Sequence, residues 1–331
     1  MINVYGDITP RTAGKAMPGF LVRVYPYLVL EKYLQMKPLP SNSTNTAIFR
    51  RYEALERALT PLVEGVTPIG KNITKTDVQL TLQQFGDFVQ LTDVIKDFHE
   101  DDVFLEYGDI VMRQAAQTLE TLRYNVLKAG TNVFFANGTQ RSDVNTALTL
   151  GMQRKVTRAL KRQNAEYITK QTSSSPNWGT VNVRAAFIGL THPDCENDVR
   201  AMTGFKDAVD YGAKVPVDSF EIGAVEDVRY IRSTIFESFV DAGGNKGAMV
   251  SSAGVKADVY PVLYLAENFA ASVPLMNKTS ITGPIVHNPG TISDSDKLGQ
   301  RGHIGWKAYF GCIILNQLFG ARVEVGATEL V

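Results

Sequence analysis

The sequence predicts an α+β fold in which strands and one long helix follow each other in separate stretches of the chain. Three observations lead to this prediction: apolar residues alternate with polar ones over residues 78–91, an amphipathic pattern runs unbroken over residues 103–129, and residues 304–325 are apolar and strand-like. The length of 331 residues corresponds to about two or three domains. A hydrophobic content of 44% excludes a disordered chain.

Charge and cysteine content exclude further classes. The 34 basic and 34 acidic residues cancel, so no global positive field draws the chain to nucleic acid or to a membrane surface. Two cysteines are too few for disulfide bonds to hold together a chain of this length, and we expect Cys195 and Cys312 to be reduced thiols. The sequence has no secretory-signal pattern at its start and no apolar run of about 20 residues, so we expect no membrane association.

The pattern of the first 92 residues predicts a segment that does not fold on its own. Residues 1–48 mix turn residues with isolated apolar groups, which is typical of an arm that lies across another surface. Residues 46–59 follow a helical pattern, and residues 60–92 predict a two-stranded ribbon with its tip near residues 70–74. Because an isolated ribbon with a sparse apolar face is marginal in water, we expect a neighbour to complete it.

The next segment predicts an unusually long helix over residues 103–129, capped by Asp101 or Asp102 and ending at Gly130. Its length of about 40 Å far exceeds that of an average helix of about 11 or 12 residues. We therefore expect it to be a structural spine. The predicted buried stripe consists of Phe104, Tyr107, Val111, Ala115, Thr118, Leu122, Val126 and Ala129.

A second amphipathic helix is predicted over residues 143–166, with one buried and one basic face. The basic face consists of Arg154, Lys155, Arg158, Lys161 and Arg162. After it, a helix is expected to begin at His192-Pro193-Asp194, because proline favours the first helical position. Strands or short apolar elements are predicted at residues 185–191, 228–233, 236–240 and 259–265, and residues 304–325 are expected to pair back into the core.

Catalytic motifs are missing from the sequence. It contains no phosphate-binding loop, no dinucleotide fingerprint, no HExxH, no GxSxG and no CxxC. The one cluster of chemically capable residues, His192, Asp194, Cys195 and Glu196, fits zinc binding or nucleophilic catalysis. A helix cap beside a packed cysteine explains it better, because no partner His/Cys pair lies at metal-site spacing. We therefore predict no enzyme activity, no cofactor and no metal.

Charge is unevenly distributed along the chain. Residues 93–109 contain seven acidic residues and one basic residue, a net charge of −6, whereas residues 110–170 contain ten basic and three acidic residues, a net charge of +7. Opposed patches of this kind suit a protein that binds copies of itself, since charge pairs set register and orientation. An acidic helix N-terminus and an ordinary solvated helix face account for part of the pattern.

Several segments, taken in order, resemble a known family. Residues Thr60–Pro68, Lys75–Gly86 and Val89–Asp93, followed by the long helix, resemble the major capsid proteins of tailed double-stranded-DNA phages, which have the HK97-like fold. The resemblance is closest to the N4-like subfamily and runs from about residue 55 to 325. Further matching positions are Thr191–Pro193, Asp198–Arg200, Glu221–Ile231, Asp241–Gly243 and Gly305–Lys307.

The resemblance implies an organisation for the whole chain. The segments it implies are an N-terminal arm (1–58), an extended loop (59–95), a peripheral domain with the spine helix (96–135), an axial domain (136–299) and return strands of the peripheral domain (300–331). No long charged helical segment precedes the arm, so scaffolding is expected either from a separate protein or from a leader already removed. Some relatives cross-link their loops through a lysine, and Lys71 and Lys75 lie near the loop tip.

The implied function is a structural one. Hexamers and pentamers of the chain would assemble in the host cytoplasm into an icosahedral virion capsid, with portal, scaffolding and decoration proteins as partners and packaged DNA bound non-specifically. The alternative is the shell protein of a cellular encapsulin-type nanocompartment. The basic helix face would meet DNA or an acidic neighbour, and we favour the neighbour. The predicted inter-subunit contacts are Glu64, Lys71, Lys75, Asp97, Asp101, Asp102, Arg154, Arg158, Lys161 and Arg162.

Overall fold

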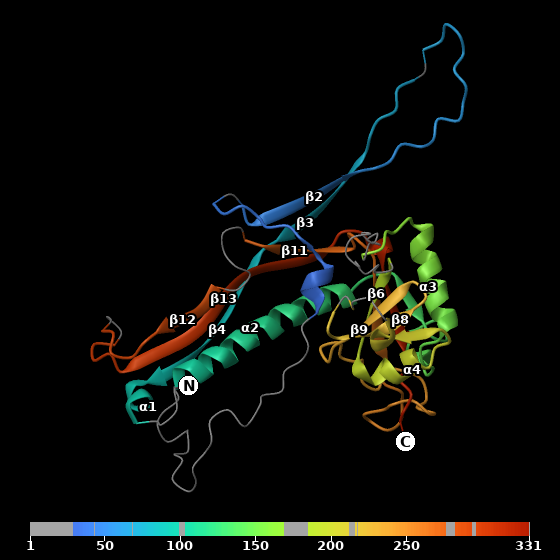
Figure 1. Cartoon of the computed structure of the whole chain (residues 1–331). Helices are drawn as coiled ribbons and strands as arrows, with labels where there is room; N and C mark the ends of the chain where they lie inside the picture. Colours follow the sequence, from blue (N-terminus) through green and yellow to red (C-terminus); the bar gives the residue numbers. More distant parts are fainter. Residues whose placement is uncertain are drawn as a thin grey trace, which may run out of the picture.

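The computed structural model shows three parts: an elongated sheet with a long helix along it, a compact body, and a ribbon that projects away from both (Figure 1). The mixed α/β architecture agrees with the predicted fold class. None of the helices in the described parts of the chain is both long and apolar enough to span a membrane. The structure describes residues 29–42, 44–67, 69–98, 103–168, 185–211, 216, 218–275, 282–292 and 296–330.

The elongated sheet is built around one central strand. This strand, β13 (Arg301–Ile314), pairs with β4 along one edge and with β11 and β12 along the other, and β1 pairs with β11. Alternate residues of β13, among them Ile304, Trp306 and Phe310, are buried under the long helix. The other strands are β1 (Gln35–Met36), β4 (Gln83–Thr92), β11 (Ala270–Pro274) and β12 (Thr282–His287).

The predicted long helix is confirmed as α2 (Val103–Lys128), which lies along this sheet and follows the short α1 (Asp93–Phe98) (Figure 1). Val111 and Ala115 of the predicted stripe are buried, and the buried line continues through Leu119, Tyr124 and Leu127. The other predicted positions are less buried: Tyr107, Thr118, Leu122 and Val126 are only half-buried and Ala129 is exposed, while the side chain of Phe104 lies outside the described residues. The difference arises because α2 also packs against the 3-10 helix η2 (Leu30–Tyr33), which covers a second side of its C-terminal half.

The compact body is a seven-stranded sheet in the order β5-β14-β10-β6-β9-β8-β7. It is covered by α3 (Leu150–Arg162), which is shorter than the predicted 143–166. The Thr149 hydroxyl accepts the Met152 N–H at 3.3 Å and starts the helix, and Asn164 with φ 55° lies in the left-handed region just after its end. The strands are β5 (Val133–Phe135), β6 (Phe187–Thr191), β7 (Phe205–Asp207), β8 (Glu221–Val225), β9 (Val228–Arg232), β10 (Tyr260–Leu265) and β14 (Gly320–Val325).

The predicted strands of this body are largely confirmed. β6, β9, β10 and β14 match the predicted apolar segments, and residues 301–325 pair back into both sheets as expected. Residues 236–240 were predicted as a strand or short apolar element, and they make only an isolated bridge between Phe239 and Val259. The short remaining helices are η3 (Arg141–Asp143), η4 (Pro193–Cys195), α4 (Glu196–Arg200), η5 (Ala208–Tyr211) and η6 (Gln317–Phe319).

The structure of the projecting ribbon corrects three predictions. Residues 46–52, predicted as part of a helix, form β2 (Thr46–Tyr52), which pairs antiparallel with β3 (Lys75–Thr81). The ribbon therefore turns over residues 53–74, rather than over the predicted 70–74, and β4 pairs with β13 of the same chain instead of awaiting a neighbour. β-branched and aromatic residues of β2 favour a strand once β3 supplies the partner.

Candidate assembly surfaces

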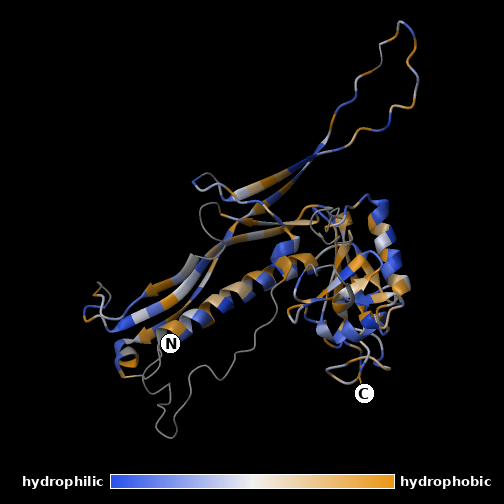
Figure 2. Cartoon of the chain, in the orientation of Figure 1, coloured by the Kyte–Doolittle hydropathy of each residue, from blue (hydrophilic) through white to orange (hydrophobic). Residues whose placement is uncertain are grey.

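The tip of the ribbon, residues 53–74, carries an exposed apolar surface. Ile69 is 95% exposed, and every large apolar side chain among its described residues is more than half exposed. Figure 2 shows apolar positions, coloured orange, spread along this loop, which projects away from the rest of the chain. Monomeric soluble proteins rarely leave so much apolar surface uncovered, so it indicates a binding site. We call Leu55, Leu59, Leu62, Val63, Val66, Ile69 and Ile73 the loop-tip residues.

The base of the ribbon is fixed by polar and apolar contacts. Arg50 donates two hydrogen bonds to Asp77 across the strands, at 2.8 and 3.1 Å, and this guanidinium holds the pKa of Asp77 below its usual range. A small core around Leu39, Leu82 and Val273 joins the ribbon to the elongated sheet. The ribbon is thus rigidly mounted at its base, while its tip makes no such core with the described chain.

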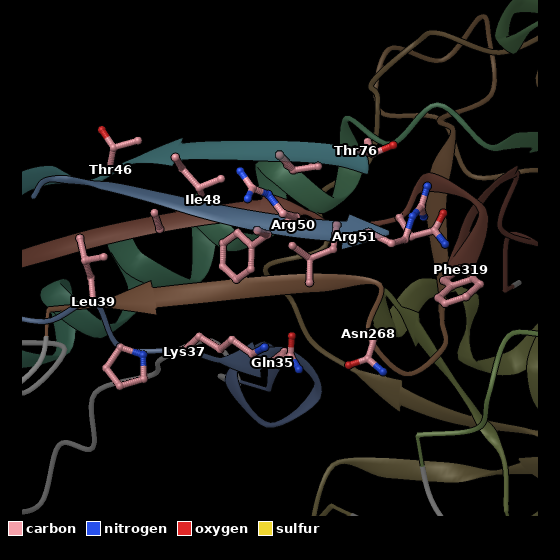
Figure 3. Close-up of a pocket in the computed structure, with 16 residues that line it drawn as sticks. Gln35, Lys37, Leu39, Thr46, Ile48, Arg50, Arg51, Thr76, Asn268 and Phe319 are labelled. Carbon is pink, nitrogen blue, oxygen red and sulfur yellow. The ribbon is translucent and has the colours of Figure 1, made fainter. Parts of the chain in front are cut away.

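A groove runs between the ribbon base and the elongated sheet (Figure 3). It has a volume of about 640 Å³, and its apolar lining includes Leu39, Ile48 and Phe49, while Lys37 and Arg51 add charge. β2 pairs with β3 along one edge, and no described strand pairs with its other edge. An unpaired strand edge beside an apolar groove is suited to accept an extended segment of another chain.

The basic face of α3 is partly neutralised within the chain. The Arg154 guanidinium donates to Glu226 at 2.9 Å and lowers the pKa of that carboxyl, and Lys161 pairs with Asp227. Both carboxylates lie in the turn between β8 and β9, far from α3 in the sequence, and the prediction did not foresee them. The predicted contact residues Arg154 and Lys161 therefore have partners in their own chain.

The other three cations of this face, Lys155, Arg158 and Arg162, have no carboxylate partner among the described residues. Arg158 and Arg162 are exposed and line a shallow trough of about 420 Å³ beside the two ion pairs. Among the described residues, none forms a salt bridge or hydrogen bond with either guanidinium. The trough thus presents uncompensated positive charge to solvent, which suits an acidic partner.

The acidic segment lies at the opposite end of the molecule, around α1 and the start of α2 (Figure 1). Asp97 is exposed in this segment, and the apolar side chains of Phe98 and Leu105 in the same segment are exposed too. The predicted contacts Asp101 and Asp102 lie outside the described residues. Because the acidic end and the α3 trough are far apart in one subunit, they can meet only between subunits.

The predicted loop contacts have simple surroundings. Glu64 is exposed, Lys71 lies 3.8 Å from the Glu56 carboxylate, and Lys75 lies 3.7 Å from that of Asp77. Exposed pairs at such distances add little to stability. All three side chains remain accessible to a neighbouring subunit.

The residues weighed for catalysis or zinc binding serve the structure. His192 Nδ1 accepts the Asp194 N–H at 3.2 Å, so the histidine caps the helix that begins at Pro193, as predicted. Cys195 is fully buried, and burial raises the pKa of its thiol; it and Cys312 are unpaired. Within the described ranges, no group of three or more His, Cys, Asp or Glu side chains is placed to hold a metal ion.

A buried charge cluster on α2 escaped prediction. Glu120, only 2% exposed, accepts the backbone N–H groups of Val29 and Leu30 at 2.6 and 2.5 Å, and it pairs with buried Arg123 at 3.3 Å. Burial raises the pKa of Glu120, while these three donors oppose the rise. The cluster fastens the first described residues to the helix. The sequence does place Glu120 and Arg123 three positions apart beside the predicted apolar stripe, and this spacing could have indicated an ion pair on one side of the helix.

The sequence matches the family described as phage capsid protein over residues 75–322, about three quarters of the chain. The chain belongs to this family. No curated protein sequence gives a significant match. The family is one of structural capsid proteins, and the chain is a major capsid protein, a component of the virion capsid.

Solved structures share the fold at low sequence identity. The capsid of Ralstonia phage GP4 gives a TM-score of 0.69 at 13% identity, covering 100% of this chain and 99% of that one. The capsid of cyanophage Pam1 gives 0.63 at 12% identity, covering 98% and 99%. The holo-encapsulin complex of Synechococcus elongatus gives 0.53 at 14% identity, covering 91% and 89%. At these identities the matches establish the fold of this phage capsid protein rather than its assembly.

Proposed function

We propose that this major capsid protein has the HK97-like fold of the N4-like phages and assembles as hexamers and pentamers into the icosahedral head of a tailed double-stranded-DNA phage. The observation that carries the proposal is the set of loop-tip residues, which their own chain leaves exposed. Burial of apolar side chains stabilises association by about 25 cal/mol per Å². A neighbouring subunit is the surface that this loop would cover.

The arm, the extended loop and the two domains of such a subunit can each be assigned to a part of this structure. The arm (1–58) and extended loop (59–95) meet in the ribbon, because β2 belongs to the first and β3 to the second. We propose that the groove beside β2 accepts an extended segment of a second subunit, since its strand edge lacks a described partner. α2 would be the spine of the peripheral domain, and the compact body would be the axial domain. The bounds 96–135, 136–299 and 300–331 do not follow the two sheets throughout, since β11 and β12 lie in the elongated sheet and β14 lies in the compact body.

The assembly is tested with the purified full chain, alone and with candidate scaffold proteins, by light scattering and negative-stain microscopy. Closed shells are the expected result. A protein that stays monomeric under all these conditions would contradict the proposal. Portal, scaffolding and decoration proteins, non-specifically bound DNA and assembly in the host cytoplasm belong to the proposed function.

An encapsulin-type shell is the second candidate, favoured by the structural match to an encapsulin at a TM-score of 0.53. The family match favours the phage capsid. Neighbouring genes distinguish the two: portal and terminase genes accompany a capsid, whereas a cargo-enzyme gene accompanies a compartment.

We also propose that the exposed cations of the α3 trough contact an acidic surface of a neighbouring subunit. Arg158 and Arg162 carry this proposal, because Arg154 and Lys161 are already paired. The acidic end around Asp97 is one such surface. Complementary charges of this kind set register and association rate more than affinity.

Reversing both charges, as Arg158→Glu with Arg162→Glu, should lower the particle yield about tenfold or more, since like charges placed together cost several kcal/mol. Particle yield is measured by sedimentation and microscopy. The charge-retaining control, Arg158→Lys with Arg162→Lys, should assemble nearly normally. Unchanged yield in the Glu variant would refute the charge-pairing proposal, whereas partial rescue by a second reversal, Asp97→Arg, would identify the acidic partner.

A further inference from the structure

An open trough lies on the face of the elongated sheet that points away from α2. Gly305 of β13 is the register partner of Ile285 on β12 and of Phe88 on β4, so the three residues form one row across the strands. The row points away from α2, because the next residue of β13, Trp306, faces that helix and donates a hydrogen bond to Gln114 at 3.2 Å. The glycine leaves the middle of the row without a side chain, and a trough of about 530 Å³ lies there.

The walls of this trough are apolar and uncovered. Phe88 is 58% exposed and Ile285 is 40% exposed, although both belong to paired strands of the sheet. The Phe88 ring is held edge-on against His303, with 6.2 Å between the ring centroids and 77° between the ring planes. The volume falls in the range of about 300–1,000 Å³ that is typical of sites enclosing a small ligand, so apolar side chains of a partner fit into it.

Lys307 adds a positive charge to the trough. It lies two positions after Gly305 on β13, so its side chain leaves the sheet on the same face, and it is exposed. No carboxylate of the described residues forms an ion pair with it. Asp87, the one acidic residue that lines the trough, accepts a hydrogen bond from the Gln114 side chain of α2 at 2.7 Å instead. The trough therefore combines apolar walls with an uncompensated cation.

The loop tip of the ribbon has the complementary chemistry. Its apolar side chains project singly from an extended segment, and Glu64 lies among them, next to Val63 and close to Val66. Glu64 is exposed and has no cationic partner in the described part of the chain, whereas the neighbouring Glu56 has Lys71 at 3.8 Å. The ribbon points away from β12 and the trough in Figure 1, so this loop cannot reach the trough of its own chain.

We propose that the trough over Gly305 receives the loop tip of a second copy of this chain, with Glu64 of that copy placed against Lys307. The inference rests on the proposed function, because it names the surface of the neighbouring subunit that the loop covers. Burial of the loop-tip side chains against Phe88 and Ile285 supplies the affinity. The single charge pair determines which part of the loop enters the trough, since charge pairs set register more than affinity.

The test exchanges the two charges in the full chain. Lys307→Glu and Glu64→Lys should each lower the particle yield about tenfold or more, because either change places like charges together at every copy of the contact. The doubly exchanged variant should recover most of the yield, since it forms the same pair with the charges reversed. Lys307→Arg, which keeps the charge, should assemble as the wild type does. All four variants should keep the Tm of the unassembled subunit, because both side chains are exposed there.

The outcomes separate this inference from the proposed function. Wild-type shells with full yield in both single reversals would overturn the docking of the loop tip in the trough and leave shell assembly intact. Loss of yield in the single reversals without recovery in the double exchange would also overturn it, because Glu64 and Lys307 would then act at separate contacts. A wild type that forms no shells would contradict both proposals.

Cross-linking locates the contact directly. Glu64→Cys together with Lys307→Cys should give disulfide-linked multimers when assembled particles are treated with a mild oxidant and run on a non-reducing gel. Neither single variant should do so, since the chain's own Cys195 and Cys312 are buried. As a control for position, Glu64→Cys combined with Arg158→Cys should stay unlinked, because Arg158 lies on α3 of the compact body. Assembled particles of the first pair that remain unlinked would overturn the inference.

Discussion

Replacing Val66 and Ile69 together by aspartate should abolish shell formation while leaving the isolated subunit folded. The two side chains are 63% and 95% exposed, so the substitution removes no contact within the subunit and should change the free energy of unfolding by less than about 0.5 kcal/mol. In the proposed assembly both side chains are buried against a neighbour. A central apolar contact is worth about 2 kcal/mol or more, which corresponds to roughly a thirtyfold loss of affinity for each interface.

The loss of shell formation should exceed the loss of affinity at a single interface, because every subunit of a closed shell makes the same contact. Shell formation is measured by sedimentation and negative-stain microscopy, and subunit folding by circular dichroism and the Tm. The matched control exchanges the two residues, as Val66→Ile with Ile69→Val, and so keeps the apolar surface and its total volume. Normal shells from the aspartate variant would remove the loop tip from the assembly interface.

The elements that the sequence predicted well are those whose signal is local. The repeat of apolar residues over 103–129 needs no information from elsewhere, and α2 ends within one residue of the prediction. The buried segments around β6, β9 and β10 are likewise apolar enough to be recognised alone. Such patterns decide whether an element exists and of which type, and they leave open what it pairs with.

The type of element formed by β2 could not be predicted from its local sequence pattern. Its sequence, Thr46–Tyr52, permits a helix or a strand, and the choice depends on β3, which is separated from β2 by 22 residues. Strand preference is largely a matter of cross-strand packing, so it cannot be read from one strand. The same holds for β4, whose partner β13 is supplied by the last part of the chain.

The predicted site residues show the same division. A helical wheel placed Arg154, Arg158, Lys161 and Arg162 on one face correctly, since that depends only on the helix period. It did not show that the β8–β9 turn brings Glu226 and Asp227 against two of them, because this turn is separated from α3 by more than 60 residues. Charge counted in blocks along the chain misses such pairing.

The second large effect is expected inside the subunit, at Glu120. Its carboxylate is the acceptor for two backbone N–H groups of residues 29 and 30 and a partner of Arg123, whose side chain is only 4% exposed. Glu120→Ala leaves that guanidinium buried with Glu31, 3.4 Å away and half exposed, as its remaining carboxylate. Breaking a buried ion pair from one side typically costs about 3–5 kcal/mol.

Glu120→Ala should therefore lower the Tm of the unassembled subunit by roughly 10 °C, from about 2–4 °C per kcal/mol for a chain of this size class. Glu120→Gln keeps an oxygen for the two N–H groups but loses the charge opposite Arg123, so an intermediate loss is expected. The control is Asp109→Ala on the same helix, which removes an exposed ion pair with Arg113 and should lower the free energy of unfolding by only about 0.3–0.5 kcal/mol.

If the two alanine variants have the same Tm, the packing of residues 29–34 against α2 does not depend on the buried carboxylate of Glu120. If Glu120→Ala alone is unstable, limited proteolysis should cut it first near residue 30, because the N–H groups that Glu120 holds are then released.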